Sequence, residues 1–358
     1  MVVGAARVGD RITYSHLISE QADSLRRAGV RVRVFGADDR YSLSGIRRNV
    51  LELRGIIREE APDVLHAQYG SCVALICALA AGSTPLVVSF CGTDLLGLPG
   101  RRYRNRNALT RMAGIVAGVR AGAIVVKSKN LLRSLPGFLR RKATVVPNGV
   151  DTDFFIPRSM EDCRERLGWS VRSKVVLVNG GKGRGRETKN LGLARAAVSA
   201  LRDTLTGVEL REISEASRDE IALMLSASDC LLVTSHHEGS PNIVKEAMAC
   251  DLPVVSVRCG DVEERLSDHR VGRLCRRDSE ELALAMRDVL ASGRRSSGRD
   301  AIVSQHLTAV EIGNVIVSLY ATCVPARRSH RQAAVAISSG HMAPRSGAAS
   351  LSASPERE

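Results

Sequence analysis

Two carboxylates eight positions apart, Glu238 and Glu246, enclose a tight turn in the sequence HHEGSPNIVKEAMAC (residues 236–250). A carboxylate beside a phosphate site repels the phosphate, so Glu246 would instead accept hydrogen bonds from a vicinal diol such as ribose. Glu238, on the other side of a diphosphate, could hold sugar hydroxyls. The spacing therefore fits a nucleotide diphosphate-sugar with one acid at each carbohydrate end. The alternative is an ordinary surface helix, on which two glutamates eight apart arise by chance.

The turn between the two acids could hold a diphosphate through its backbone. Gly239 lets the chain turn tightly, and Pro241 suits a first helical position, where its missing N–H costs nothing. The first N–H groups of a helix carry partial positive charge and bind anions. We therefore expect the donor site to be formed by Glu246 together with Gly239, Ser240, Asn242, Ile243 and Val244.

A second chemical signal is the Gly-rich basic segment NGGKGRGRETKN (residues 179–190). A flexible loop of this kind can surround a diphosphate and stabilise the charge that develops as a sugar leaves. The cations of this segment include Arg184, Arg186 and Lys189, the last of which stands just before a predicted helix. The alternative is a solvated basic hairpin.

Strands that alternate with helices must position these loops. Runs rich in Val and Leu predict strands in two series, at residues 30–36, 63–67, 85–90, 123–128 and 143–148, and at 174–180, 208–213, 229–235, 253–257 and 270–274. Helical stretches include 15–29, 189–203 and a last helix over 304–323. This alternation is typical of parallel sheets with helices on both faces, whose ligands bind at the carboxyl ends of the strands. The loop with Glu238 follows such a strand and should lie on the rim of the crevice.

The two series predict an α/β protein with two Rossmann-like, doubly wound domains that face a cleft. We expect an N-terminal domain over residues 1–155 and a C-terminal domain over 156–323, joined by the turn-rich segment 147–160. The first three residues make a poor first strand, which we expect to be truncated. Residues 324–358 are rich in Ala, Ser and Arg without apolar periodicity, which predicts a disordered tail.

Composition narrows the class of protein. No run of eighteen apolar residues occurs, so no transmembrane helix is predicted. Nine cysteines without a CxxC pair favour buried thiols in a reducing cytoplasm over disulfides or zinc. The net charge of +14 favours acidic partners, although a solvated basic surface explains it equally well. Few aromatic residues argue against nucleic acid, and the lack of a clean GxGxxG fingerprint argues against a dinucleotide oxidoreductase.

The sequence EGSPNIVKEAMACDLPVVSVRCGDVEE resembles the signature of the family 4 retaining glycosyltransferases, the group 1 glycosyl transferases of GT-B fold. The segments PNGVDTDFFIP (147–157) and FCGTDLLG (90–97) also match, and the resemblance runs from about residue 15 to 322. It implies transfer of a sugar from a nucleotide diphosphate-sugar to an acceptor hydroxyl, with retention at the anomeric carbon and without a metal. The motif-bearing positions are Glu238, Gly239, Glu246, Ala247, Pro253, Val254, Val255 and Gly260.

The resemblance implies a catalytic Lys and Arg in the segment 179–190, acting with Glu238. Lys189 matches the Lys, and the Arg is either Arg184 or Arg186, because the spacing does not decide between them.

The resemblance also points to residues on the acceptor or sugar side. Many family members have His where this chain has Cys91, and that His faces the transferred sugar. Because S–H is a weak donor, either backbone groups of Gly92 and Thr93 replace it or activity is reduced. Asp94 could orient a group or cap a helix. His66 ends a predicted strand at the crevice, and a packed histidine is the more common interpretation.

We therefore expect a metal-independent, hexosyltransferase-type enzyme with a nucleotide-sugar donor, a glycan or lipid-linked acceptor and no cofactor. Cell-envelope polysaccharide or glycolipid synthesis is the expected setting, with no nucleic-acid partner. The sequence DTD (151–153) has the form of a metal motif, but the resemblance explains it as linker. The Arg-rich stretch 101–111 could meet an anionic membrane at the cytoplasmic face. The alternative is a catalytically weak or inactive GT-B-like nucleotide-binding or partner subunit, which Cys91 and the short N-terminus favour.

Overall fold

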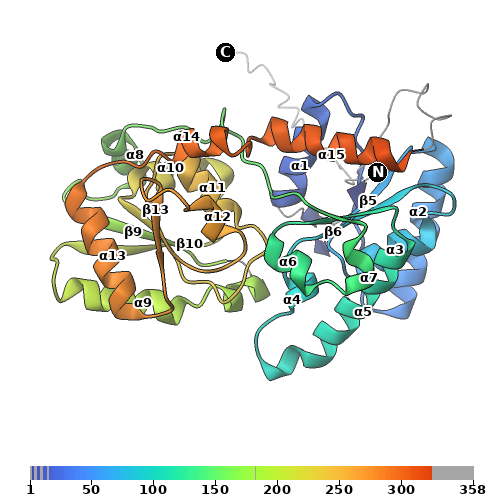
Figure 1. Cartoon of the computed structure of the whole chain (residues 1–358), viewed down its shortest axis with the longest axis horizontal. Helices are drawn as coiled ribbons and strands as arrows, with labels where there is room; N and C mark the ends of the chain where they lie inside the picture. Colours follow the sequence, from blue (N-terminus) through green and yellow to red (C-terminus); the bar gives the residue numbers. More distant parts are fainter. Residues whose placement is uncertain (1, 4–5, 9–10, 14–15, 182, 325–358) are drawn as a thin grey trace, which may run out of the picture.

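The computed structural model describes residues 2–3, 6–8, 11–13, 16–181 and 183–324, with side chains described from residue 18 except over 182–185. The predicted tail therefore lies, apart from its first residue, outside the described residues. Two α/β lobes lie side by side along the long axis of the molecule (Figure 1). Among the described residues, no helix is long and apolar enough to cross a bilayer.

The N-terminal lobe is built on six parallel strands in the order β4-β1-β5-β6-β7-β8. The strands are β1 (Val2–Val3), β4 (Val34–Phe35), β5 (Leu65–Gln68), β6 (Leu86–Phe90), β7 (Ala123–Val126) and β8 (Ala143–Val145). A separate antiparallel pair is formed by β2 (Ala6–Val8) and β3 (Arg11–Thr13). The helices of the N-terminal lobe are α1 (His16–Arg27), α2 (Leu43–Glu60), α3 (Cys72–Ala80), α4 (Thr93–Leu96), the 3₁₀ turn η1 (Arg101–Tyr103), α5 (Arg104–Arg120), α6 (Lys129–Ser134) and α7 (Gly137–Arg140).

The C-terminal lobe is built on five parallel strands in the order β10-β9-β11-β12-β13. The strands are β9 (Lys174–Asn179), β10 (Val208–Ile213), β11 (Cys230–Val233), β12 (Val254–Val257) and β13 (Gly272–Cys275). Its helices are α8 (Met160–Leu167), the 3₁₀ turn η2 (Gly183–Thr188), α9 (Leu191–Arg202), α10 (Arg218–Ala227), α11 (Asn242–Ala249), α12 (Val262–Arg265), α13 (Ser279–Ser292) and α14 (Gly298–Ser304).

The two predicted doubly wound parallel sheets are confirmed, and a strand lies within or overlaps each of the ten predicted strand ranges. Val2 and Val3, a poor strand by sequence, form β1, which lies inside the sheet because it pairs with both β4 and β5. The predicted strand 30–36 is reduced to Val34–Phe35. Its one neighbour, β1, offers only two residues for pairing, so the ladder ends there.

The last helix, α15 (Ala309–Cys323), packs on the N-terminal lobe although it follows the C-terminal lobe in sequence (Figure 1). It lies against α1, where Ser24 donates a hydrogen bond to the carbonyl oxygen of Ala309. A Cβ at Gly313 would overlap the Ser24 hydroxyl, so a glycine is needed for this close approach. The predicted domain limits remain a prediction, but residues 309–323 belong by their contacts to the first lobe.

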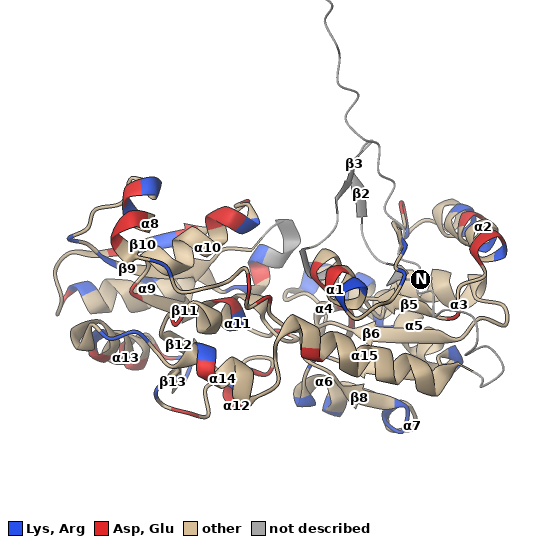
Figure 2. Ribbon diagram, turned by 90° about the horizontal axis from the view of Figure 1, so that it is seen from above, with Lys and Arg blue, Asp and Glu red and all other residues tan. Residues whose placement is uncertain are grey.

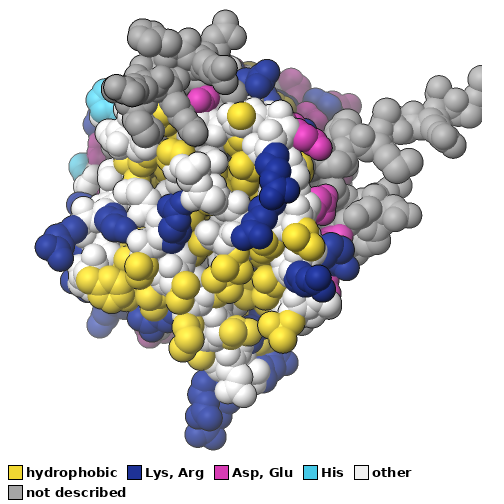
Figure 3. Space-filling view, turned by 90° about the vertical axis from the view of Figure 1, so that its right-hand side faces the viewer, with side chains coloured by type: hydrophobic (Ala, Val, Ile, Leu, Met, Phe, Trp, Pro, Cys, Tyr) yellow, Lys and Arg dark blue, Asp and Glu magenta, His cyan; other side chains and the backbone are white. Residues whose placement is uncertain are grey.

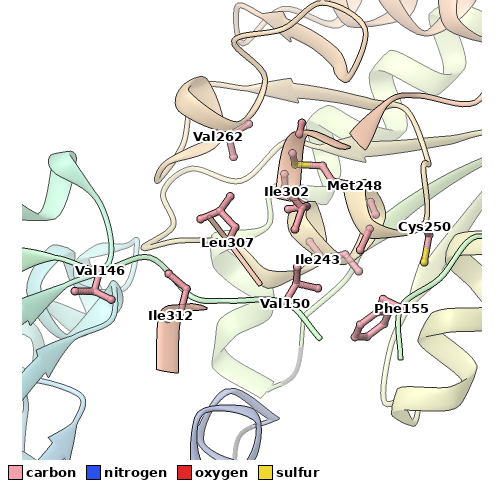
Figure 4. Close-up of a cluster of buried hydrophobic side chains, with 14 of the residues drawn as sticks. Val146, Val150, Phe155, Ile243, Met248, Cys250, Val262, Ile302, Leu307 and Ile312 are labelled. Carbon is pink, nitrogen blue, oxygen red and sulfur yellow. The ribbon is translucent and has the colours of Figure 1, made fainter. Parts of the chain in front are cut away.

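The chain crosses between the lobes twice, and the two crossings are joined to each other. Val150 donates its N–H to the carbonyl of Leu307 at 2.9 Å and accepts the N–H of Ala309 at 2.7 Å. Apolar side chains cover this junction and reach the underside of α11 (Figure 4). The cluster includes Val146, Val150, Phe155, Ile243, Met248, Ile302, Leu307 and Ile312. The helix that follows Glu238 is therefore anchored on the crossing segments.

Candidate active site

The site forms where the strand order of the C-terminal sheet reverses. Strands β9 and β11 are neighbours, but the chain leads from β9 to β10 on one side of the sheet and from β11 to β12 on the other. In doubly wound sheets, ligands bind in the crevice outside the strand ends at such a switch point. The loop after β9 brings Lys189 to this crevice, and the loop after β11 brings Glu238. The Thr234 hydroxyl donates to the carbonyls of Lys189 and Asn190, at 2.9 and 3.2 Å, and so ties the two loops together.

Lys189 and Glu238 form an ion pair in this crevice. Lys189 Nζ lies 2.6 Å from Glu238 Oε1, and the Ser235 hydroxyl donates to the same oxygen at 2.9 Å. The two side chains are only 16% and 17% exposed. They line a pocket with Asn179, Pro241, Ile243 and neighbouring apolar residues. Two of the predicted catalytic residues are therefore together.

A buried polar network holds the turn that follows Glu238. Lys245, fully buried, donates to the Ser240 hydroxyl at 2.8 Å and to the Pro241 carbonyl at 3.1 Å. Ser240 donates in turn to Asp261 Oδ2 at 2.8 Å. Burial lowers the pKa of Lys245, and the nearby Asp261 opposes this shift. Helix α11 begins just beyond with no side-chain cap, so its first N–H groups are free of side-chain competition for an anion.

Glu246 lies within α11 and is 5% exposed. It is therefore enclosed in the lobe that holds Lys189 and Glu238, not turned out to solvent. The predicted donor residues Asn242, Ile243 and Val244 open the same helix.

Asn148, which sequence analysis did not single out, ties the turn to the N-terminal lobe. Its Nδ2 donates to the carbonyl of Ser240 at 3.1 Å and to Asn242 Oδ1 at 2.8 Å. The only sequence signal was its place among the turn formers of the crossing segment. The amide fixes the donor-side turn directly to the first crossing.

Asp94 organises the opposite rim of the cleft. Its carboxylate accepts the N–H groups of Gly70, Cys91 and Gly92 at 2.6, 2.9 and 2.7 Å. Burial raises the pKa of Asp94, against the opposing effect of these hydrogen bonds. Asp94 therefore holds the loop between β6 and α4. It is not the N-cap of α4, which is Gly92, so the structure favours the orienting role over the capping role.

The two rims touch through glycines. A Cβ at Gly239 would overlap the carbonyl oxygen of Cys91, so only glycine fits there. Gly92, at φ +150°, lies against the backbone of Gly239. His237 Nε2 also lies 2.8 Å from the Gly97 carbonyl across the cleft. The predicted sugar-side loop and the loop with Glu238 are therefore brought together.

Cys91 does not offer a reactive thiolate. Burial, with the nearby Asp94, raises the pKa of its thiol to about 12, and its Sγ is 3.8 Å from Gln68 Oε1. The thiol remains neutral at physiological pH, where a neutral S–H is a weak hydrogen-bond donor.

His66 is a packed residue. Its ring is fully buried, with Nδ1 at 2.6 Å from the Tyr320 hydroxyl and Nε2 at 2.7 Å from the Ser89 hydroxyl. Burial, with the nearby Lys127 charge, lowers the pKa of His66 well below its usual value. The structure thus favours the packing interpretation, since the ring has no exposed edge for a sugar.

Arg184 and Arg186 are the two candidates for the second cation. Arg186 forms an ion pair with Glu212 of the edge strand β10 and is 45% exposed. The side chain of Arg184 lies outside the described residues. Glu187, which lies in sequence between these two arginines and Lys189, accepts hydrogen bonds from Tyr103, at 2.7 Å, and from Arg102.

The aspartate that opens the DTD sequence joins the lobes. Asp151 accepts hydrogen bonds from Arg27 of α1 at 2.8 Å and from Arg218 of α10 at 3.0 Å. Burial opposes ionisation, but these two arginines lower the pKa of Asp151 to about 2. Among the described residues no group of three or more His, Cys, Asp or Glu is placed to hold a metal ion.

A second pocket lies beside this bridge. Lys127, at the carboxyl end of β7, lines it and is 1% exposed. Within the part of the chain that the structure describes, its ammonium group has no hydrogen bond or ion pair. Burial lowers the pKa of Lys127. A buried cation without a partner is costly, so this pocket is suited to an anionic group.

Comparison with known proteins places these features in context. Residues 13–154 match the family described as Glycosyltransferase Family 4, and residues 163–292 match the family described as Glycosyl transferases group 1. A D-inositol 3-phosphate glycosyltransferase of Geodermatophilus obscurus is 30% identical over 218 residues, 48% of either chain. The chain spans between about half and two thirds of the length of the curated relatives first matched.

Solved structures share the two-lobed architecture. A sucrose-phosphate synthase from Thermosynechococcus elongatus superposes with a TM-score of 0.70 at 16% identity, covering 89% of this chain and 97% of that chain. Anabaena HepE, solved in complex with UDP-glucose, gives 0.67 at 17% identity, covering 90% and 100%. At these identities the likeness concerns the fold alone.

Proposed function

The chain belongs to the family 4, group 1 glycosyltransferases of GT-B fold, and from this premise we propose that it is a retaining enzyme that transfers a sugar from a nucleotide diphosphate-sugar to an acceptor hydroxyl. The observation that carries the proposal is the Lys189–Glu238 pair beside the uncapped start of α11. It combines a cation, a carboxylate and a helix N-terminus in one crevice. That set matches the diphosphate and the sugar of such a donor.

Each donor-side residue has a distinct role in this proposal. Glu238 accepts hydrogen bonds from the hydroxyls of the transferred sugar, and Glu246 accepts them from the ribose. Lys189 and the first N–H groups of α11 neutralise the diphosphate as its bond to the anomeric carbon breaks. Arg184 or Arg186 adds a second cation, and Arg186 must leave Glu212 to do so. With these groups the developing charge is stabilised without a metal ion or another cofactor.

The acceptor faces the N-terminal lobe. Gly92 and the loop organised by Asp94 form its rim near Glu238, and the pocket with Lys127 lies farther toward the crossing segments. An acceptor with a phosphate or carboxylate would pair with the Lys127 ammonium. Glycans and lipid-linked sugars of the cell envelope commonly carry such groups, so we propose that setting. HepE binds UDP-glucose, and uridine donors are therefore the first to test.

Ligand binding and turnover test the proposal separately. Thermal unfolding is measured with UDP, GDP, ADP and their hexose conjugates. The nucleotides of one base should stabilise the protein, raising the free energy of unfolding by about 2.7 kcal/mol at a hundredfold excess over Kd. The stabilising donor should then be hydrolysed or transferred by the wild-type protein and not by Glu238→Gln. The matched control is Glu263→Gln, since Glu263 is 61% exposed on α12. If no nucleoside diphosphate shifts the transition, the proposal fails.

A second candidate function is a nucleotide-binding partner subunit without transfer activity. The neutral Cys91 thiol favours it, because a strong hydrogen-bond donor is lacking on that rim. This candidate predicts stabilisation by a nucleoside diphosphate together with no sugar release from any conjugate. Recovery of transfer by Cys91→His would then identify the missing group.

A further inference from the structure

One continuous segment of the N-terminal lobe is strongly basic and contains no acidic residue. Residues 95–150 contain twelve Arg or Lys and no Asp or Glu. They span the end of α4, then η1, α5, α6 and α7, and the strands β7 and β8. Figure 3 shows the outer end of the N-terminal lobe, where hydrophobic and basic side chains are intermixed and acidic ones lie mainly toward the upper and right-hand edges. Such a surface attracts anionic partners over several ångströms.

An exposed apolar row runs along α5 within this region. Leu109, Met112, Val116 and Val119 follow the spacing that places side chains on one face of a helix. Each is between 51% and 65% exposed. Helix α5 buries only small residues on its other side, chiefly Ala113, Gly114, Ala117 and Gly118. The larger apolar side chains therefore point away from the core.

Helix α7 extends the row. Lys142 Nζ donates to the carbonyl of Val119 at 2.7 Å, and a Cβ at Gly118 would lie 3.0 Å from Leu139, so the two segments are in contact. Phe138 of α7 is 56% exposed. The apolar surface thus combines the α5 row with an aromatic side chain from a neighbouring helix. We call the four residues of α5 and Phe138 the α5 face.

Basic side chains share the segment 95–150 with the α5 face, and of those that the structure describes only Arg102 and Lys129 form an ion pair. Within the described residues, no ion pair is formed by the exposed Arg101, Arg104, Arg111, Arg120, Arg133 and Arg141. Basic charge elsewhere is commonly paired, as in Arg270 with Asp268 and Arg276 with Glu281. The apolar row and the unpaired arginines together have the composition of a helix that lies in a membrane interface.

Other partners fit these observations less well. Two copies of the chain joined through this face would bring their unpaired arginines together, and like charges oppose such contacts. Nucleic acid would satisfy the arginines but would give the aliphatic row no contact, and bases stack on aromatic side chains that this face mostly lacks. An anionic bilayer supplies both an acidic surface and an apolar layer.

We propose that the α5 face docks the protein on the surface of an anionic lipid bilayer. Arg102 and Tyr103, in the turn η1 just before α5, contact Glu187, which is close in sequence to Lys189 of the cleft. Docking through α5 therefore brings the cleft close to the bilayer. This orientation gives a lipid-linked acceptor access to the site. That consequence rests on the proposed function, whereas the docking itself is independent of it.

Vesicle sedimentation of the full chain tests the proposal without any donor. One set of vesicles contains phosphatidylcholine alone, and the other contains about 30% phosphatidylglycerol as the anionic lipid. Both sets are used at low and at high salt. We expect the wild-type protein to pellet only with the anionic vesicles, and less at high salt. Leu109→Ser/Met112→Ser/Val116→Ser and Arg104→Gln/Arg111→Gln/Arg120→Gln should each weaken binding at least tenfold. The controls, Leu284→Ser/Val303→Ser and Arg166→Gln/Arg172→Gln/Arg294→Gln, change exposed residues of the other lobe and should stay within twofold.

The other outcomes overturn the proposal. Equal binding of the serine variant and the wild type would show that the α5 face is not inserted. A lipid-independent dimer that the serine variant disperses would assign the face to a second copy. Duplex DNA that binds more tightly than the vesicles, with no effect of the serine changes, would assign the charge to nucleic acid. Stabilisation by UDP in the same preparations reports the proposed function separately, so loss of one result does not imply loss of the other.

Discussion

Lys189 Nζ lies 2.6 Å from Glu238 Oε1 in the crevice between β9 and β11. Each charge satisfies the other in a site where both side chains are less than one-fifth exposed. A donor would exchange this contact for two others, since its diphosphate attracts Lys189 while its sugar hydroxyls donate to Glu238. The pair thus keeps two groups of opposite charge in place without leaving either one unpaired, which in a partly buried site would be costly.

Replacement of Lys189 by Met should abolish most of the transfer activity. The change removes the cation that stabilises the leaving diphosphate, and loss of one such group typically lowers kcat by about 10²–10³. It also leaves Glu238 unpaired, so the melting temperature should fall. The double variant Lys189→Met/Glu238→Gln has no unpaired charge and should regain the melting temperature while it remains inactive. Initial rates at saturating donor, with thermal melts of all three proteins, make the comparison. A wild-type kcat in Lys189→Met would remove this residue from the mechanism.

Replacement of Glu246 by Gln should weaken nucleotide binding through the ribose. Hydrogen bonds to a charged group contribute about 1.5–3 kcal/mol, so Kd should rise roughly tenfold to a hundredfold. Calorimetry with a nucleoside diphosphate and with its 2′-deoxy analogue separates this contact from general disruption. The deoxy analogue lacks one hydroxyl and should bind the wild-type and variant proteins with similar affinity. An equal loss for both ligands would contradict the assignment of Glu246 to the diol.

The alternation of apolar runs and helices was sufficient to predict both sheets, because parallel strands buried on both faces have continuous apolar sequences. The loops after β9 and β11 could also be placed on one rim, since carboxyl ends of parallel strands share an edge. These two inferences predict that the loops carrying Lys189 and Glu238 lie on one rim, whereas Lys189 itself was identified within its loop by the resemblance to the family. The motif that begins at Glu238 indicated which residues of the second loop and its helix would line the donor site.

The contacts between the lobes could not be predicted from the same pattern. Asn148 meets Ser240 only because the two crossing segments pair with each other, and no periodicity records that pairing. The same is true of α15, whose Tyr320 reaches His66 across 254 positions of sequence. Lys127 sits at the end of an apolar run and gave no local sign that it lines a pocket. Such features depend on tertiary packing, which local sequence does not specify.

Replacement of Gly239 by Ala should separate nucleotide binding from transfer. A side chain there would collide with the Cys91 carbonyl, so the two rims could not approach as closely. We expect the C-terminal lobe to bind the nucleoside diphosphate nearly as before, while kcat falls by more than tenfold. The matched control is Gly192→Ala in α9, where nothing lies within 4 Å and a helical alanine adds about 0.5–1 kcal/mol of stability. Calorimetry and initial rates measure the two effects. Parallel losses of affinity and rate would instead indicate that Gly239 acts on the donor alone.

The buried His66 should make the protein less stable in mild acid. Burial, with the nearby positive Lys127, lowers the pKa of His66 well below its usual value of about 6.5. Below pH 6.5 the unfolded chain therefore binds a proton at this residue while the folded protein does not. The free energy of unfolding then falls with decreasing pH, by at most about 1.4 kcal/mol per pH unit. His66→Gln removes the titrating ring, so its stability should decline less between pH 7 and pH 5.5, although the lost contacts with Tyr320 and Ser89 lower it throughout. His236, whose pKa is lowered by burial in the same direction, is present in both proteins and cancels from the difference between them. Urea unfolding at each pH gives that difference, and parallel profiles for the two proteins would show that His66 is accessible to protons in the folded state.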